Sequence, residues 1–289
     1  MLIKRKSIEA QANRKSGPGK SGSASDAGDA RTARPAPRPR KPKFAPVTLS
    51  EEKGVVFLHF GTEWIQGAMR VRKPDWIELE YAQQMMAWML FNEQPARVAQ
   101  LGLGTGALTK FCYRQFPQAQ VVAVELNPAV ITVCHSMFKL PLDDDRLSVL
   151  EMDAMDFVMD PANHGTLDAL QVDLYDATVR GPVLDTPEFY AACAACLKPD
   201  GIMTVNLFGD HASYPKNYKA IRYAFADTVC LAPVHQGNVV VLGFRTPREF
   251  DFPALYARAE QITAATRLPT KSWVNGIKAW HGARQKKGE

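Results

Sequence analysis

The chain has 289 residues and a hydrophobic fraction of 46%, enough for one large domain or two modest ones. No apolar run approaches the ~18 residues that a membrane-spanning helix needs. Five scattered cysteines do not form the framework of a disulfide-rich secreted domain, and the basic N-terminus lacks the apolar core of a secretory signal. We therefore expect a cytoplasmic protein without a membrane partner.

The formal net charge of +5 is distributed unevenly along the chain. Residues 1–45 hold 12 Lys/Arg and 3 acids, a net of +9, and the remainder holds 23 Lys/Arg and 27 acids, a net of −4. Gly, Ser and Pro with dense positive charge cannot bury enough apolar surface to offset the entropy of ordering. This composition predicts a disordered tail, which either contacts nucleic acid through its phosphates or is a solvated extension.

After the tail, region 46–75 is predicted to form a short β-hairpin. Two runs rich in strand-forming residues, 54–60 and 63–72, flank a glycine turn. Apolar positions over 76–91 then recur at helical spacing, which predicts a helix in front of the first central strand.

Region 76–250 alternates predicted strands with predicted helices. The strands are expected at 98–101, 121–124, 147–150, 168–173, 202–207, 228–232 and 238–244. This alternation predicts an α/β fold with a doubly wound, Rossmann-like, mostly parallel sheet of about seven strands, the last two making an antiparallel edge. Region 251–289 is predicted to contain one C-terminal helix, 252–266, and then a loose basic end.

The turn after the first central strand carries the first functional signal. Three glycines stand there at alternate positions: Gly102, Gly104 and Gly106. Glu125 ends the next strand. Glycines let a strand turn sharply into a helix and let a ligand approach the backbone, and an acid about twenty residues later suits a pair of ribose hydroxyls. The pattern predicts a crevice that binds a nucleoside.

Polar residues also stand at the ends of the later strands: Asp153, Asp173 with Asp176, and Asn206. Each one alone is commonly a helix cap or a loop residue. Ligands of such a sheet bind outside the carboxyl ends of its strands, so the recurrence favours one pocket lined by these residues.

Cys193 and Cys196 form a Cys-x-x-Cys pair within an alanine-rich helical run. A zinc site usually needs four such ligands, and no second pair or histidine motif lies nearby. We interpret the pair as residues that pack a helix, and we expect no metal.

The amino-acid sequence around these residues resembles the spermidine synthase (polyamine aminopropyltransferase) family, which shares the fold of adenosylmethionine-dependent methyltransferases. The resemblance covers residues 54–245. It rests on Tyr81-Ala-Gln-Gln-Met-Met, Gly102-Leu-Gly-Thr-Gly-Ala, Val124-Glu-Leu-Asn-Pro and Asp173-Leu-Tyr-Asp.

The resemblance implies a role for each matching residue. The nucleoside would be held by Gly102, Gly104, Thr105 and Gly106 of the turn, by Glu125 at the ribose, and by Asp153 with Ala154 at the adenine edge. In the part of the site that binds the amine substrate, Asp173 would be the catalytic carboxylate and Asp176 a partner that binds the amine. Tyr81 would line the channel through which the amine enters.

The implied activity is aminopropyl transfer from decarboxylated adenosylmethionine to a polyamine. An alkyl amine has a reference pKa of ~10.4 and is protonated at pH 7, so a carboxylate is needed to hold the cation and to accept or relay its proton. The remaining catalysis is the positioning of two reactants.

Two other functions stay open. The family usually carries an aspartate where this chain has Thr105, and that acid helps to hold the propylamine of the decarboxylated nucleoside. An adenosylmethionine-dependent methyltransferase with adenosylmethionine as co-substrate is therefore an alternative. A second alternative is a non-catalytic nucleoside-binding protein whose basic tail binds nucleic acid. The sequence also leaves a homodimer open.

The nucleic-acid hypothesis for the tail has a direct test. If the tail binds phosphates, the affinity of the full chain for duplex DNA or RNA should fall steeply as salt concentration rises, because bound counterions are released. Deleting residues 1–45 should remove this binding, as measured by fluorescence anisotropy. Equal affinity in the truncated chain would contradict the hypothesis.

Overall fold

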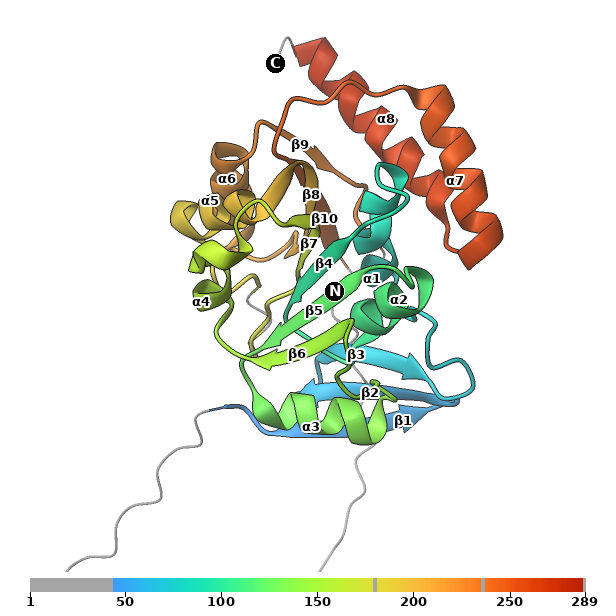
Figure 1. Cartoon of the computed structure of the whole chain (residues 1–289), viewed down its shortest axis with the longest axis vertical. Helices are drawn as coiled ribbons and strands as arrows, with labels where there is room; N and C mark the ends of the chain where they lie inside the picture. Colours follow the sequence, from blue (N-terminus) through green and yellow to red (C-terminus); the bar gives the residue numbers. More distant parts are fainter. Residues whose placement is uncertain (1–43, 179–180, 235–236, 288–289) are drawn as a thin grey trace, which may run out of the picture.

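A computed structural model of the chain describes residues 44–178, 181–234 and 237–287 (Figure 1). The disorder predicted for the basic tail concerns residues that lie, apart from Phe44 and Ala45, outside this described part. The described residues form a small N-terminal sheet, a large central sheet with helices on both faces, and two C-terminal helices (Figure 1).

The N-terminal sheet has three antiparallel strands, β1 (Val47–Glu52), β2 (Val55–Phe60) and β3 (Ile65–Arg70). The predicted hairpin corresponds to β2 and β3, and β1 is an addition to it. Lys53 and Gly54, both at positive φ (50° and 74°), make the two-residue turn that joins β1 to β2. β1 is mostly exposed and has few apolar residues, so the sequence pattern did not reveal it.

The single helix predicted over 76–91 was wrong in its start and in its type. The structure has α1 (Glu80–Gln84) followed by the 3-10 helix η1 (Met85–Leu90). The chain before Glu80 is still turning, with the Trp76 N–H donating to the Lys73 carbonyl at 3.0 Å. All six η1 residues are buried, and η1 contacts β8 and β10, so packing decides its geometry.

The central sheet confirms the predicted fold class. Its strands are β4 (Arg97–Leu101), β5 (Gln120–Glu125), β6 (Leu147–Glu151), β7 (Leu167–Val172), β8 (Leu197–Phe208), β9 (Asp227–Cys230) and β10 (Asn238–Phe244). Their order is β6-β5-β4-β7-β8-β10-β9, and β10 runs antiparallel to both of its neighbours. The sheet is therefore mostly parallel, and its antiparallel strand lies between β8 and β9.

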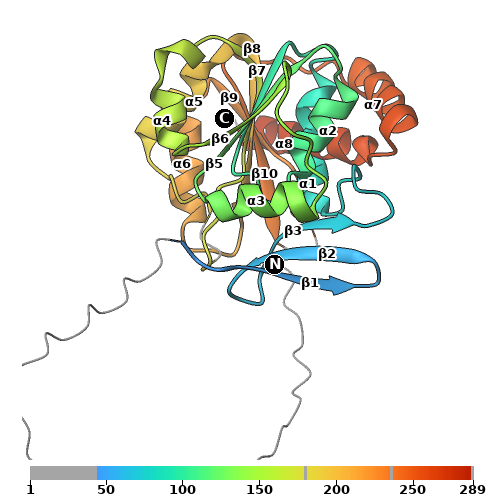
Figure 2. The same cartoon turned by 60° about the horizontal axis from the view of Figure 1, so that its bottom comes forward.

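Helices cover both faces of this sheet (Figure 2). One face carries α4 (Ala154–Met159), α5 (Pro187–Cys196) and α6 (Tyr214–Ala224), with η2 (Pro161–Asn163) after α4. The other face carries α1, η1, α2 (Ala107–Gln115), α7 (Phe252–Thr266) and α8 (Thr270–Lys287). α3 (Pro128–Met137) lies between the central and N-terminal sheets, where Val130 and Phe138 share a core with Leu58 and Met69.

The loose basic end predicted after 266 was wrong, because this segment forms α8. Trp273, Val274 and Ile277 are buried in the core beneath it, and the helix contacts α7, β9 and η1. Together with Trp280, which is partly buried against the same core, these side chains make one narrow apolar stripe on a helix that is otherwise mostly polar and basic. Tertiary packing thus stabilises a segment whose average composition is typical of an exposed end.

Two further predictions concern membrane-spanning helices and the pair of cysteines on α5. Within the part of the chain that the structure describes, no helix is long and apolar enough to cross a membrane. Cys193 and Cys196 lie on α5 as free, buried thiols, in agreement with a packing role.

Candidate active site

The register of four parallel strands creates a row of functional residues at one edge of the sheet. Leu101 of β4 lies opposite both Val124 of β5 and Val172 of β7, and Val172 lies opposite Val205 of β8. The next residue on each strand therefore falls in line: Glu125, Gly102, Asp173 and Asn206. This row crosses the point between β4 and β7 where the strand order reverses, the usual ligand position in such sheets.

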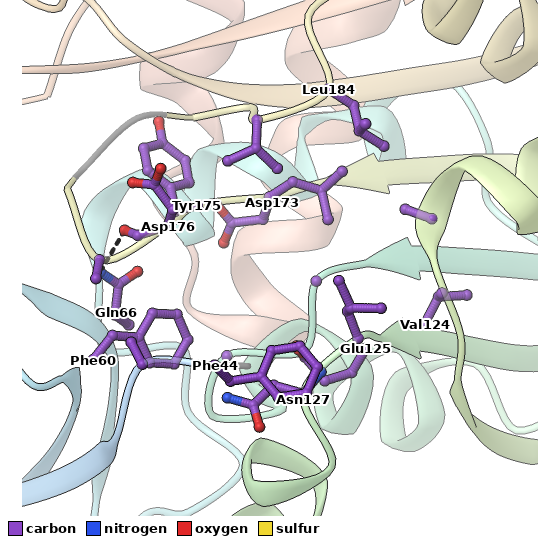
Figure 3. Close-up of a pocket in the computed structure, with 18 of the residues that line it drawn as sticks. Phe44, Phe60, Gln66, Val124, Glu125, Asn127, Asp173, Tyr175, Asp176 and Leu184 are labelled. Atoms are coloured by element: carbon purple, nitrogen blue, oxygen red, sulfur yellow. Dashed lines mark hydrogen bonds between the residues drawn. The ribbon is translucent and has the colours of Figure 1, made fainter. Parts of the chain in front are cut away.

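A cavity of about 490 Å³ opens over this row (Figure 3). Eight of the ten predicted site residues line it: Tyr81, Gly102, Gly104, Glu125, Asp153, Ala154, Asp173 and Asp176. The volume is within the range of ~300–1,000 Å³ that small-molecule sites occupy. The structure thus brings together residues that are up to 95 positions apart, from Tyr81 to Asp176.

Thr105 and Gly106 are not among the residues that line this cavity, so their predicted contact with the nucleoside stays a prediction. Thr105 is 2% exposed, and its hydroxyl donates to the Ala68 carbonyl at 3.4 Å. It packs against Gly67 of β3, where a Cβ atom would lie 2.7 Å from the Thr105 methyl carbon. Gly106, at φ 66°, begins α2 and faces the Leu140 side chain. The N-terminal sheet therefore covers this side of the turn.

Glu125 fixes the glycine turn to the end of β5. Its two carboxylate oxygens accept from the Leu103 N–H at 3.0 Å and from the Asn127 N–H at 2.9 Å. Burial raises the pKa of the Glu125 carboxyl, and the backbone hydrogen bonds oppose that rise. A carboxylate offers about four lone-pair positions, so both oxygens keep capacity for ribose hydroxyls. Gly102 is required here, since a side chain at this position, with φ 87°, would collide with the Asp173 carbonyl.

Asp153 combines a structural role with a place in the cavity. It caps α4 by accepting the Met155 N–H at 2.8 Å, and its side chain lines the cavity together with Ala154. The capping alternative considered from the sequence is therefore present, and it does not remove the residue from the site.

Asp173 is a carboxylate of the site with two side-chain hydrogen bonds. One oxygen accepts from the Tyr81 hydroxyl at 3.2 Å and the other from the Asn206 amide at 2.9 Å. Burial raises the pKa of Asp173 to about 6, although both hydrogen bonds favour the ionised form and lower it. A buried carboxyl with a pKa near neutrality can both accept and release a proton, which is typical of an acid–base group.

Four residues of this cavity come from the N-terminal region and were not predicted, and Ala45 is one of them. Phe44, Phe60 and Gln66 line it opposite the strand ends (Figure 3). The Gln66 amide donates to the Asp176 backbone carbonyl at 3.4 Å, and the Asp176 carboxylate accepts from the Thr178 N–H at 2.8 Å. The only signal in the sequence that could have indicated Gln66 is a polar residue inside the otherwise apolar run of β3. In the structure this glutamine is buried, with 8% of its surface exposed.

The charge of the cavity is one-sided. Its described lining includes four acids and no Lys, Arg or His: Glu125, Asp153, Asp173 and Asp176. Clefts lined by charge of one sign concentrate ligands of the opposite sign. The described residues also include no group of three His, Cys, Asp or Glu side chains arranged to hold a metal. The four acids of the lining therefore suit a ligand that carries positive charge.

Comparisons with known proteins point to one family. The family model described as "Spermine/spermidine synthase domain" matches residues 78–229. The chain is 32% identical over 243 residues to the polyamine aminopropyltransferase of Chromobacterium violaceum, covering 83% of this chain and 92% of the relative.

Solved structures share the fold. A spermidine synthase in complex with the transition-state analogue AdoDATO superposes with a TM-score of 0.61 at 18% identity, covering 84% of this chain and 88% of the other. Human methyltransferase-like protein 13 in complex with SAH has a TM-score of 0.57 at 22% identity, covering 66% of this chain and 94% of the other. At these identities the superpositions show a common fold.

The raised pKa of Asp173 gives a prediction that needs no substrate. In a carbon-detected NMR titration, the Asp173 carboxyl, assigned from its loss in Asp173→Asn, should be half-protonated near pH 6. In Tyr81→Phe the carboxylate loses a hydrogen bond that stabilises its ionised form, so the midpoint should move to higher pH. A midpoint near pH 4 in the unsubstituted protein, or a downward shift in Tyr81→Phe, would contradict the assignment.

Proposed function

The chain belongs to the spermine/spermidine synthase family, and we propose that it transfers the aminopropyl group of decarboxylated adenosylmethionine to an amine nitrogen of a polyamine. The protein is a transferase. The observation that carries the proposal for its substrates is the cavity at the β4–β7 switch, where Asp173 lies among four acids.

The nucleoside occupies the β4–β5–β6 side of the cavity in this proposal. Glu125, already held by two backbone N–H groups, accepts the ribose hydroxyls. Asp153 and Ala154, at the start of α4, take the adenine edge. Gly102 and Gly104 give the ligand access to the backbone of the turn, since neither carries a side chain.

The amine occupies the side formed by Tyr81, Asp173 and Asp176. A polyamine arrives as a cation, and the two carboxylates supply the charge that holds it. The Tyr81 hydroxyl and the Asn206 amide hold the Asp173 carboxylate in place, so that it is positioned before the amine binds.

The chemical step is a substitution at the carbon next to the sulfonium. The lone pair of a neutral amine nitrogen forms the new C–N bond while the C–S bond breaks, and the bonding pair returns to sulfur as a neutral thioether. Because the amine arrives as an ammonium, its attacking nitrogen first gives a proton to the Asp173 carboxylate, which passes it on to solvent, and the nitrogen becomes positive again once the C–N bond has formed. The raised pKa of Asp173, about 6, makes it a better proton acceptor than an exposed aspartate while it is still mostly ionised at pH 7.

The charge of the cavity favours the decarboxylated nucleoside. The carboxylate of ordinary adenosylmethionine would enter a cavity whose described lining holds four acids and no basic side chain. Like charges in a partly desolvated site repel strongly. The Thr105 hydroxyl donates to the Ala68 carbonyl of β3, and its side chain carries no charge that would reverse this preference.

Methyl transfer from adenosylmethionine is the second candidate. It is favoured by Thr105 in place of the acid expected for the family, and by the fold shared with the methyltransferase-like protein solved with SAH. Both candidates use the same nucleoside subsite, so they differ in the group that the cavity accepts beyond the sulfur atom.

The first test concerns the role of Asp173. We expect Asp173→Asn to lower kcat at least ~100-fold, because general acid–base groups contribute ~10²–10⁴-fold, and to leave nucleoside affinity within a few-fold. Asp168→Asn is the matched control: Asp168 is also buried, at 7% exposure, but it binds the backbone of Ala96 and lies outside the cavity lining. Full turnover in Asp173→Asn would reject the catalytic role.

The second test separates the two candidate reactions. Isothermal titration calorimetry should give tighter binding for decarboxylated adenosylmethionine than for adenosylmethionine, by at least ~10-fold if one like-charge contact costs ~1.4 kcal/mol. The difference should shrink at high salt, because screening weakens the repulsion. A preference for the carboxylated nucleoside would favour methyl transfer instead.

A further inference from the structure

Two buried asparagines join β8 and β10 behind the proposed catalytic carboxylate. Asn206 and Asn238 are each 1% exposed. We propose that Asn238 is a positioning residue that holds the Asn206 amide with its N–H group toward Asp173. This inference rests on the proposed function, in which Asp173 receives the proton of the amine.

Hydrogen bonds link the side chains of Asn238, Asn206 and Asp173 in a continuous series. The Asn238 amide N–H donates to the Asn206 side-chain oxygen at 2.9 Å, and the Asn206 amide N–H donates to Asp173 at 2.9 Å. Tyr175 adds a second contact, since its hydroxyl donates to the Asn206 backbone carbonyl at 3.2 Å.

The chemistry of the carboxylate fixes which group donates and which accepts in this hydrogen-bonded series. An ionised carboxylate only accepts hydrogen bonds, so the Asn206 group that faces Asp173 must be its N–H. The Asn206 oxygen then points the other way and needs a donor, because an unpaired buried acceptor is costly. Asn238 supplies that donor. Without it, the Asn206 oxygen is left as an unpaired buried acceptor, and the contact with Asp173 alone opposes rotation of the amide, which would place an oxygen against the carboxylate.

Strand topology makes this contact. β10 runs antiparallel to β8, with Val240 opposite Asn206 and Asn238 opposite Phe208. Side chains two positions apart on one strand share a face, so Asn238 lies diagonally across from Asn206 on the same face of the sheet. Two residues separated by 32 positions thus form a fixed pair beneath the cavity.

The surroundings of Asp173 contain no competing cation among the described residues. The titratable groups that face it or share its cavity are Tyr81 from α1, Tyr175 and Asp176 from the loop after β7, Glu125 from β5, and Asp153 before α4. Apart from Tyr81, Asn206 is the side chain whose hydrogen bond favours the ionised form of Asp173. Burial raises the pKa of Asp173, and the Asn206 amide in this orientation makes one of the two side-chain contacts that lower it.

The experiment is a double-mutant cycle read by NMR titration of the Asp173 carboxyl, with Asn238→Leu, Asn206→Leu and the double variant. Leucine keeps the branched heavy-atom skeleton of asparagine and removes both its donor and its acceptor. Asn238→Leu should raise the Asp173 pKa by about one unit, the size expected when a hydrogen bond to a charged group is weakened. The double variant should match Asn206→Leu alone, because Asn238 acts through Asn206.

Two variants guard against a purely structural explanation. Asn217→Leu removes another fully buried amide, on α6, whose oxygen accepts from the Tyr190 hydroxyl at 2.6 Å. This variant should lower the melting temperature without moving the Asp173 pKa. Asn238→Ala serves as a second probe if Asn238→Leu does not fold, with the same expected shift.

The outcomes separate this inference from the proposed function. An unchanged Asp173 pKa in the Asn238 variants, or shifts that add in the double variant, would overturn the positioning role whatever the activity is. Full turnover of Asp173→Asn would instead overturn the catalytic role and leave the titration result intact. When the positioning role of Asn238 and the catalytic role of Asp173 are both correct, the acid limb of the pH profile of kcat/KM in Asn238→Leu moves to higher pH. It moves by the same amount as the midpoint of the Asp173 titration.

Discussion

The parallel pairing of β4 with β7 is the constraint on which the rest of the site depends. It sets Leu101 opposite Val172, so that Gly102 and Asp173 emerge side by side at the carboxyl edge of the sheet. Successive side chains of a strand point to opposite faces, and a slip of one residue would turn Asp173 away from the cavity. The same closeness excludes any side chain at Gly102. The glycine turn and the carboxylate are therefore one structural unit.

This unit holds a buried acid in a cavity without basic side chains among its described lining residues. Removing an ionised carboxylate from water is costly, and the hydrogen bonds from Tyr81 and Asn206 offset part of that cost. The part that remains raises the pKa of Asp173 to about 6. In the proposed reaction, cationic substrates supply the missing positive charge only when they bind. Binding and proton acceptance thus depend on the same electrostatic imbalance.

The small N-terminal sheet completes the site from the opposite side. β3 carries Gln66 into the cavity, and its neighbour Gly67 leaves room for Thr105. Thr105 is consequently a packing residue in this chain, at the position where the family usually carries an acid. The change at this position removes a charge from the turn and uses the side chain to join the two sheets.

The sequence by itself determined the fold class and most of the site. Parallel strands end at one edge, so glycines and acids that follow successive strands had to meet, and Gly102, Glu125 and Asp173 do. Local patterns could not reveal α8, whose narrow apolar stripe is stable only against α7 and β9, or the inward direction of Thr105. Only the tertiary structure decided the pairing of Asn206 with Asn238. That contact depends on the insertion of β10 between β8 and β9, a long-range register that the periodicity of neither strand encodes.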